Sequence, residues 1–243
     1  MTRKDYKRRI GSGFQKVDQR LLMAGDVDVG LSSGNDLYIT GDAADNRIQV
    51  STVNGQIRVS GISTTINNST TPFEVNANVV DDIFIRMGSG DDWVQVNNVH
   101  LNNTTHGLLD IDTDDGNDLV GVYNSSARDL KLETDSGHDH AIVSYSAFGR
   151  DMDIDLGSGD DELDLYAAYA GDDIWVDAGS GRDDVALQGV TARDVTDLDM
   201  GDGSDVLWIN GGTFGDLLIH AEGGNDRATV QNATITDDIY AHM

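Results

Sequence analysis

The sequence contains no cysteine and a single proline, and only 16 of its 243 residues are lysine or arginine. Without cysteine, the chain can form neither disulfides nor thiolate metal sites. No apolar run approaches the length needed to cross a bilayer, so we expect no membrane span. The few basic residues face 43 acidic ones, and the formal net charge is −27. So negative a surface repels phosphate, which excludes a nucleic-acid partner.

Almost all of this acidity comes from aspartate, with 39 Asp against 4 Glu, and it is accompanied by 28 Gly. Aspartate and glycine are typical of turns, whereas acidic helix surfaces mainly use glutamate. Seven of the basic residues precede Leu21, so the rest of the chain is even more acidic than the average. The composition predicts a turn-rich protein with one narrow core.

A segment built around Gly-x-Asp recurs seven times, for example as GSGDDELDL from Gly157 and GDGSDVLWI from Gly201. The shared glycines are Gly90, Gly116, Gly137, Gly159, Gly181, Gly203 and Gly224. The shared aspartates follow two residues later, at Asp92, Asp118, Asp139, Asp161, Asp183, Asp205 and Asp226. Because the spacing stays near 22 residues, we expect each repeat to be one structural unit stacked on the next.

Apolar residues alternate with other residues after each shared aspartate, as at Leu163 and Leu165. A polar turn follows, and then a second alternating run, as at Ile174 and Val176. Period two indicates strands with one buried face, and one repeat cannot bury such faces alone. The sequence therefore predicts an all-β fold, a parallel β-helix or solenoid whose coils consist of strand, turn, strand and Gly-Asp turn.

Three regions are expected along the chain: a basic N-terminal tail or sorting segment over residues 1–30, irregular capping strands over 31–82, and about seven coils over 83–243. In the cap, Asn54-Gly55 between apolar runs predicts a two-residue hairpin turn. The polar stretch Thr64–Thr71 is expected to be an exposed loop. The segments SSGNDLYITG from Ser32 and GDAADNRIQV from Gly41 are weaker copies of the repeat.

A second aspartate row precedes the second strand of the coils, and Arg128, Arg150 and Arg193 stand before three of its members. The row consists of Asp129, Asp151, Asp173, Asp194, Asp216 and Asp238. We expect these side chains to accept backbone N–H hydrogen bonds in the turn while the arginines offset charge. The alternative is a catalytic Arg–Asp pair.

The segments LGSGDDELD from Leu156 and MGDGSDVLW from Met200 resemble the haemolysin-type (RTX-like) calcium-binding repeat, Gly-Gly-x-Gly-x-Asp-x-hydrophobic-x, a β-helix motif. The resemblance extends over about residues 88–230. It implies that Ca²⁺ ions lie between stacked turns, bound by the seven shared aspartates and by backbone carbonyls. Those carbonyls would belong to residues near Gly90, Gly116, Gly137, Gly159, Gly181 and Gly203.

Electrostatics independently favours a cation beside the shared aspartates. Equivalent carboxylates on coils about 4.8 Å apart repel by roughly 1 kcal/mol in water and about 3.5 kcal/mol at an effective dielectric constant near 20. Ca²⁺ accepts irregular oxygen coordination better than Mg²⁺. The alternative is that the aspartates cap their turns without metal.

A further acidic row alternates with buried positions of the second strand and consists of Asp112, Glu133, Asp155, Asp177 and Asp199. These side chains either complete the calcium shell or form a solvated face. His138 and His140 flank Asp139 and could mark a transition-metal site, although surface histidines are the commoner outcome. Trp93, Trp175 and Trp208 recur in no common register, so no aromatic sugar platform is expected.

The N-terminal segment FQKVDQRLLMAGDV from Phe14 resembles the sorting segment of many planctomycete surface proteins, with Val17–Met23 at its core. This resemblance implies export, and extracellular calcium is concentrated enough to fill weak sites. The alternative is a basic, disordered tail.

We therefore expect a non-catalytic, calcium-binding and calcium-stabilised structural or adhesive module, secreted or at the cell surface. Its expected partners are calcium ions, with polysaccharide or surface proteins as further candidates. The alternative is a carbohydrate-active β-helix enzyme, a polyuronate lyase or epimerase, but Lys131 is the only lysine after residue 16. A third interpretation is a module of a larger surface protein.

Overall fold

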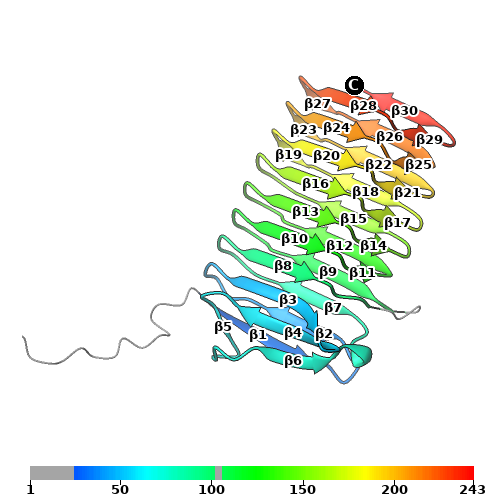
Figure 1. Ribbon diagram of the computed structural model, residues 1–243. Helices are drawn as coiled ribbons and strands as arrows, with labels where there is room; N and C mark the ends of the chain where they lie inside the picture. Colours follow the sequence, from blue (N-terminus) through cyan, green and yellow to red (C-terminus); the bar gives the residue numbers. More distant parts are fainter. Residues whose placement is uncertain (1–24, 102–105) are drawn as a thin grey trace, which may run out of the picture.

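The computed structural model describes residues 25–101 and 106–243. They form an all-β parallel solenoid of about seven turns with a spacing of about 22 residues, so the predicted fold class is confirmed. Figure 1 shows the coils stacked in chain order from the N-terminal end, in blue, to the C-terminal end, in red. The expected sorting segment Val17–Met23 lies outside the described residues.

Most coils of the described chain contribute strands to two long sheets and to a six-stranded short sheet, and three of the last coils also contribute to a second, three-stranded one. The first long sheet has the order β30 (Ile239–His242), β26 (Asp216–His220), β22 (Val195–Asp199), β18 (Ile174–Asp177), β15 (Met152–Asp155), β12 (Asp129–Glu133), β9 (Leu108–Asp112), β7 (Ile83–Arg86), β2 (Leu37–Thr40), β1 (Asp26–Leu31) and β5 (Thr65–Ile66). The second long sheet has the order β28 (Arg227–Gln231), β24 (Val206–Asn210), β20 (Asp184–Gln188), β16 (Glu162–Tyr166), β13 (His140–Ser144), β10 (Leu119–Tyr123), β8 (Trp93–Asn97), β3 (Arg47–Val53), β4 (Gln56–Gly61) and β6 (Phe73–Asn76).

The alternating apolar residues form the core between the two long sheets, as predicted. Leu163 and Leu165 on β16 are buried, and in register Leu163 lies between Ala141 of β13 and Val185 of β20. On the first long sheet, Ile174 and Val176 of β18 are buried in the same way. Each coil thus adds one layer to a continuous apolar column.

The turn expected between the two long strands contains a two-residue strand of its own. These strands stack into the short sheet, which consists of β11 (Ser126–Ala127), β14 (Ala147–Phe148), β17 (Tyr169–Ala170), β21 (Thr191–Ala192), β25 (Thr213–Phe214) and β29 (Thr234–Ile235). The second residue of most members is buried, for example Phe148 and Phe214. Each of these strands has only one inward-facing residue, and an alternating pattern needs several. The sequence therefore did not reveal this sheet.

The N-terminal end departs from the simple repeat. The Asn54-Gly55 hairpin is confirmed, since β3 and β4 pair antiparallel with both turn residues at positive φ. The weaker repeat copies already belong to the solenoid, because β2 and β3 pair in parallel with β7 and β8. Antiparallel β1, β4 and β6 adjoin them, with a short 3₁₀ turn at Ala77–Val79. Strand β1 begins at Asp26, inside the range expected for the tail.

The expectation of an exposed loop over Thr64–Thr71 is wrong at its start. Thr64, Thr65 and Ile66 are buried, and the Thr64 hydroxyl oxygen accepts a hydrogen bond from the Arg47 backbone N–H. Strand β5 pairs with β1, so this polar segment has become part of the sheet. Threonine fits a strand well, and its polar character alone gave the wrong prediction.

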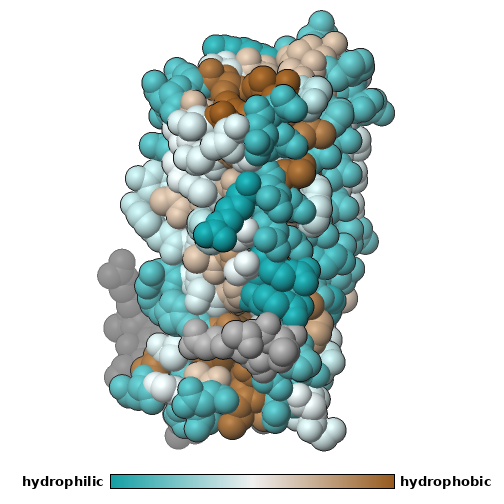
Figure 2. Space-filling view, turned by 90° about the vertical axis from the view of Figure 1, so that its right-hand side faces the viewer, coloured by the Kyte–Doolittle hydropathy of each residue, from teal (hydrophilic) through white to brown (hydrophobic). Residues whose placement is uncertain are grey.

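The C-terminal coil exposes positions that are buried in the other coils. Ile239 pairs with the buried Leu217, yet more than half of its surface is exposed. Val230, Tyr240 and Met243 are also exposed. Figure 2 views the molecule from the right-hand side of Figure 1, and hydrophobic surface gathers there at the top, the C-terminal end.

Candidate functional site: the stacked glycine–aspartate turns

The Gly-x-Asp turns connect the first long sheet to the second and stack along one edge of the solenoid, at the left in Figure 1. In the last coils their backbones pair as the strands β19 (Ser180–Gly181), β23 (Asp202–Gly203) and β27 (Gly223–Gly224). Isolated bridges such as Ser136↔Ser158 continue this pairing toward the N-terminus. Equivalent atoms of the turns therefore lie one strand spacing apart.

Close stacking explains the shared glycine. At Gly159, φ is +155°, and a Cβ atom would lie 1.4 Å from the carbonyl oxygen of Gly137 in the preceding turn. The same clash would arise at Gly137 against Gly116. No side chain fits so close to backbone, so the glycine row is required by the stack itself, with or without metal.

The shared aspartates form an interior row that we call the aspartate ladder, comprising Asp92, Asp118, Asp139, Asp161, Asp183, Asp205 and Asp226. All except the half-buried Asp226 are at most 3% exposed. Each backbone N–H from Asp92 to Asp205 donates to Oδ1 of the ladder aspartate in the next coil, at 2.7–3.0 Å. At the N-terminal end, Asn46 takes the equivalent position and donates its N–H to Asp92.

The other carboxylate oxygen of the ladder is left without a partner. Among the described residues, Oδ2 of Asp92, Asp118, Asp139, Asp161, Asp183 and Asp205 is buried and has no hydrogen bond, although the nearby side chains of Thr113 and Thr134 lower the pKa of Asp118 and Asp139. Burial raises the pKa of Asp92, Asp139 and Asp183 to about 7, and that of Asp118 to about 6. Burial also raises the pKa of Asp161 and Asp205. The ladder thus needs a proton or a cation to offset its buried charge.

The outer acidic row lies beside the same turns. Asp177 Oδ1 accepts a 3.0 Å hydrogen bond from the Gly179 N–H, and Asp199 does the same from Gly201. These residues cap the turn that follows their own strand, as Asx turns do. Asp155 and Asp177 pair in register on neighbouring strands, so the row follows the solenoid axis.

Two groups of at least three potential metal ligands occur within residues 25–101 and 106–243, and neither contains a ladder aspartate. Asp112, Asp114 and Asp135 meet at the outside of the turns, where Arg86 lies 3.3 Å from Asp112. The ladder aspartates line up in single file instead of converging.

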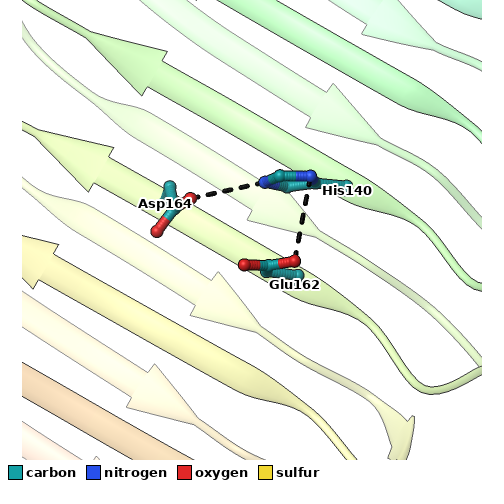
Figure 3. A group of neighbouring side chains, drawn as sticks. All are labelled: His140, Glu162 and Asp164. Atoms are coloured by element: carbon teal, nitrogen blue, oxygen red, sulfur yellow. Dashed lines mark hydrogen bonds and ion pairs between the residues drawn. The ribbon is translucent and has the colours of Figure 1, made fainter.

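The second group is the cluster of His140, Glu162 and Asp164 on the outer face of the second long sheet (Figure 3). His140 Nε2 lies 3.3 Å from Asp164, and Nδ1 lies 3.8 Å from Glu162. Both ring nitrogens therefore face carboxylates. His138 points elsewhere, because its Nδ1 accepts the Asp160 N–H. The two histidines therefore do not converge on one metal position, in keeping with the surface role that the sequence favoured over a metal pair.

Aspartates of the row at the opposite turn accept backbone N–H hydrogen bonds, as expected. Asp173 Oδ1 accepts the Val195 N–H at 2.8 Å, and Asp216 Oδ1 accepts the Asp238 N–H at 2.9 Å. Arg150 lies between Asp129 and Asp151, at 3.3 and 2.9 Å. Arg128 and Arg150 thus offset charge in this row, as predicted for them.

Sequence reasoning missed one feature, a hollow on the outer face of the first long sheet beside Trp175. Trp175 pairs in register with Asp153 on one side and Asp197 on the other. The signal was present in the 22-residue offsets from 153 to 175 to 197, but Trp175 does not share its register with another tryptophan.

Comparison of the chain with protein-family models, curated proteins and solved structures found no match. Among the residues with described positions, no helix has the length and apolar character needed to cross a membrane.

Proposed function

We propose that this chain is a non-catalytic structural or adhesive module, secreted or at the cell surface. Ca²⁺ binds to its solenoid and stabilises it. The observation that carries the proposal is the unpartnered, buried Oδ2 atom in six ladder aspartates in successive coils. An unpaired charge in the interior is strongly destabilising, and six of them would compete with the stability of a whole domain.

The donor atoms suit calcium. A Cβ atom placed on Gly159 would lie 1.4 Å from the carbonyl oxygen of Gly137 and 3.1 Å from Oδ1 of Asp161, so a carbonyl and a carboxylate oxygen are close neighbours at this turn. Ca²⁺ prefers such hard oxygen ligands and tolerates irregular geometry. The residues that would hold it are the ladder aspartates and the carbonyls of the glycine row. Asp155, Asp177 and Asp199 of the outer row would add charge beside them.

Uniform repetition supports a scaffold. The ladder hydrogen bond is repeated without a break from Asp92 to Asp226, whereas an enzyme needs dissimilar groups converging at one place. Calcium at extracellular concentrations fills sites that are too weak for the cytosol, which supports an exported location.

Isothermal titration with Ca²⁺, and with Mg²⁺ as the comparison ion, tests the proposal. Asp183→Asn lies in the middle of the ladder and should impair two neighbouring inter-coil sites, whereas Asp226→Asn near its end should impair fewer. Asp184→Asn is the matched control, because Asp184 is the exposed neighbour of Asp183. No calcium binding, or equal losses in all three variants, would contradict calcium at the ladder.

A further inference from the structure

The outer face of the first long sheet carries a hollow of about 420 Å³ that spans strands β15, β18, β22 and β26. Its lining includes Asp153, Trp175, Asp177, Asp197, Asp199 and His220. Parallel pairing places Asp153, Trp175 and Asp197 in one row across the strands, and Asp177, Asp199 and His220 in a second row beside it. The hollow therefore runs across the strands, along the axis of the solenoid.

The hollow combines an aromatic face with carboxylates. Trp175 is 40% exposed, although indole is the largest apolar side chain and is usually well covered. Carboxylates lie on both sides of it in the same row. His220 Nε2 lies 3.4 Å from Asp197 Oδ1, and the lining contains no lysine or arginine. Lys131, the nearest cation along the row, is engaged with Glu133 at 2.7 Å.

We propose that this hollow binds a linear polysaccharide that carries protonated amino groups, a β-1,4-linked glucosamine chain. The indole face can stack on a sugar ring and attract an ammonium group. Asp177 and Asp199 lie one strand step apart, about 4.8 Å, and Asp153 and Asp197 lie two steps apart with Trp175 between them. One sugar of an extended chain is about as long as one such step. Amino groups of such a chain point alternately to either side, and carboxylates lie in both rows.

The same charges exclude the opposite class of polymer. A polyuronate would bring a carboxylate against five acidic side chains of the lining, Asp153, Asp177, Asp197, Asp199 and Glu222, without a basic partner. The hollow thus gives the proposed scaffold a polysaccharide partner. This inference rests on the proposed function only in treating the bound sugar as a ligand and not as a substrate.

The test is titration of the full chain with a glucosamine hexasaccharide in mildly acidic buffer, with excess Ca²⁺ present. The fully N-acetylated hexasaccharide and an oligogalacturonate are the comparison ligands. We expect the glucosamine chain to bind, the acetylated chain to bind more weakly and the galacturonate not to bind. Trp175→Ala should weaken binding about tenfold, the effect of losing one cation–aromatic contact.

Trp208→Ala is the matched control, because Trp208 lies on β24 of the other long sheet and should leave the affinity unchanged. Asp153→Asn and Asp197→Asn keep side-chain size and should weaken binding and reduce its salt dependence. Circular dichroism shows whether each variant is folded. If Trp175→Ala is unfolded, the two aspartate variants provide the test instead.

Three results would overturn the proposal for the hollow. They are equal binding to all three sugars, equal affinity in Trp175→Ala and Trp208→Ala, or no binding of the glucosamine hexasaccharide. None of these outcomes affects the calcium proposal, which is tested separately by metal titration. Cleavage of the glucosamine chain would contradict the non-catalytic role and leave the groove in place.

Discussion

Replacing Asp183 by asparagine should have opposite effects with and without calcium. Asp183 is 1% exposed, its Oδ1 accepts the Asp161 N–H at 2.8 Å, and its Oδ2 has no partner. Asparagine keeps the acceptor and removes the charge. The chain already uses asparagine at this register, since Asn46 occupies the equivalent position before Asp92 and its side-chain amide donates to the Ala44 carbonyl.

The size of the effect follows from protonation. Burial raises the pKa of Asp183 from 3.8 to about 7. Between these two values the unfolded chain loses its proton while the folded chain keeps it, so stability falls as pH rises. The contribution of protonated Asp183 to the free energy of unfolding is fully present below pH 3.8. It is lost progressively up to about pH 7 and stays lost at higher pH. The complete loss is on the order of 4 kcal/mol.

In chelator, Asp183→Asn should therefore be more stable than the parent at alkaline pH, by up to that amount, and equal to it near pH 4. In Ca²⁺ the variant should be less stable than the parent, because it lacks one of the proposed calcium ligands. Urea unfolding at both pH values, with and without calcium, measures these differences, and Asp184→Asn provides the control. A variant that is less stable than the parent in chelator at alkaline pH would refute the reasoning.

Three further outcomes are expected. Asp183→Ala removes the acceptor of the Asp161 N–H, so urea unfolding should show a loss of about 1–3 kcal/mol near pH 4, where charge plays no part; unchanged stability would exclude a structural role for the ladder bond. Gly159→Ala should cost about 3 kcal/mol or more through its clash with Gly137, whereas Gly189→Ala, at φ +64° with open space around it, should cost about 1 kcal/mol; equal melting temperatures would contradict the stacking argument. Deleting one period, Asp161–Arg182, should leave a folded, shorter solenoid that binds one coil's share of Ca²⁺ less, as circular dichroism and titration would show; an unfolded product would oppose the repeat model.

The sequence predicted the coils well because their signals are local and repeated. The spacing of the shared aspartates and the period-two runs such as Leu163–Leu165 identified the solenoid and its buried faces. The roles of Gly159 and Asp161 were less accessible, because each depends on an atom one coil away: the Gly137 carbonyl and the Asp139 N–H. Sequence spacing shows that such positions stack, but not which atoms meet. The Trp175 hollow was missed because its residues differ from coil to coil.

The most direct test of calcium stabilisation is the melting temperature of the parent protein at alkaline pH in EDTA, in Mg²⁺ and in Ca²⁺. At that pH the ladder has lost its protons, so only a cation can offset the buried charge. We predict a large rise in melting temperature with Ca²⁺, a much smaller one with Mg²⁺, and the lowest value in EDTA. The same melting temperature in all three solutions would contradict the account.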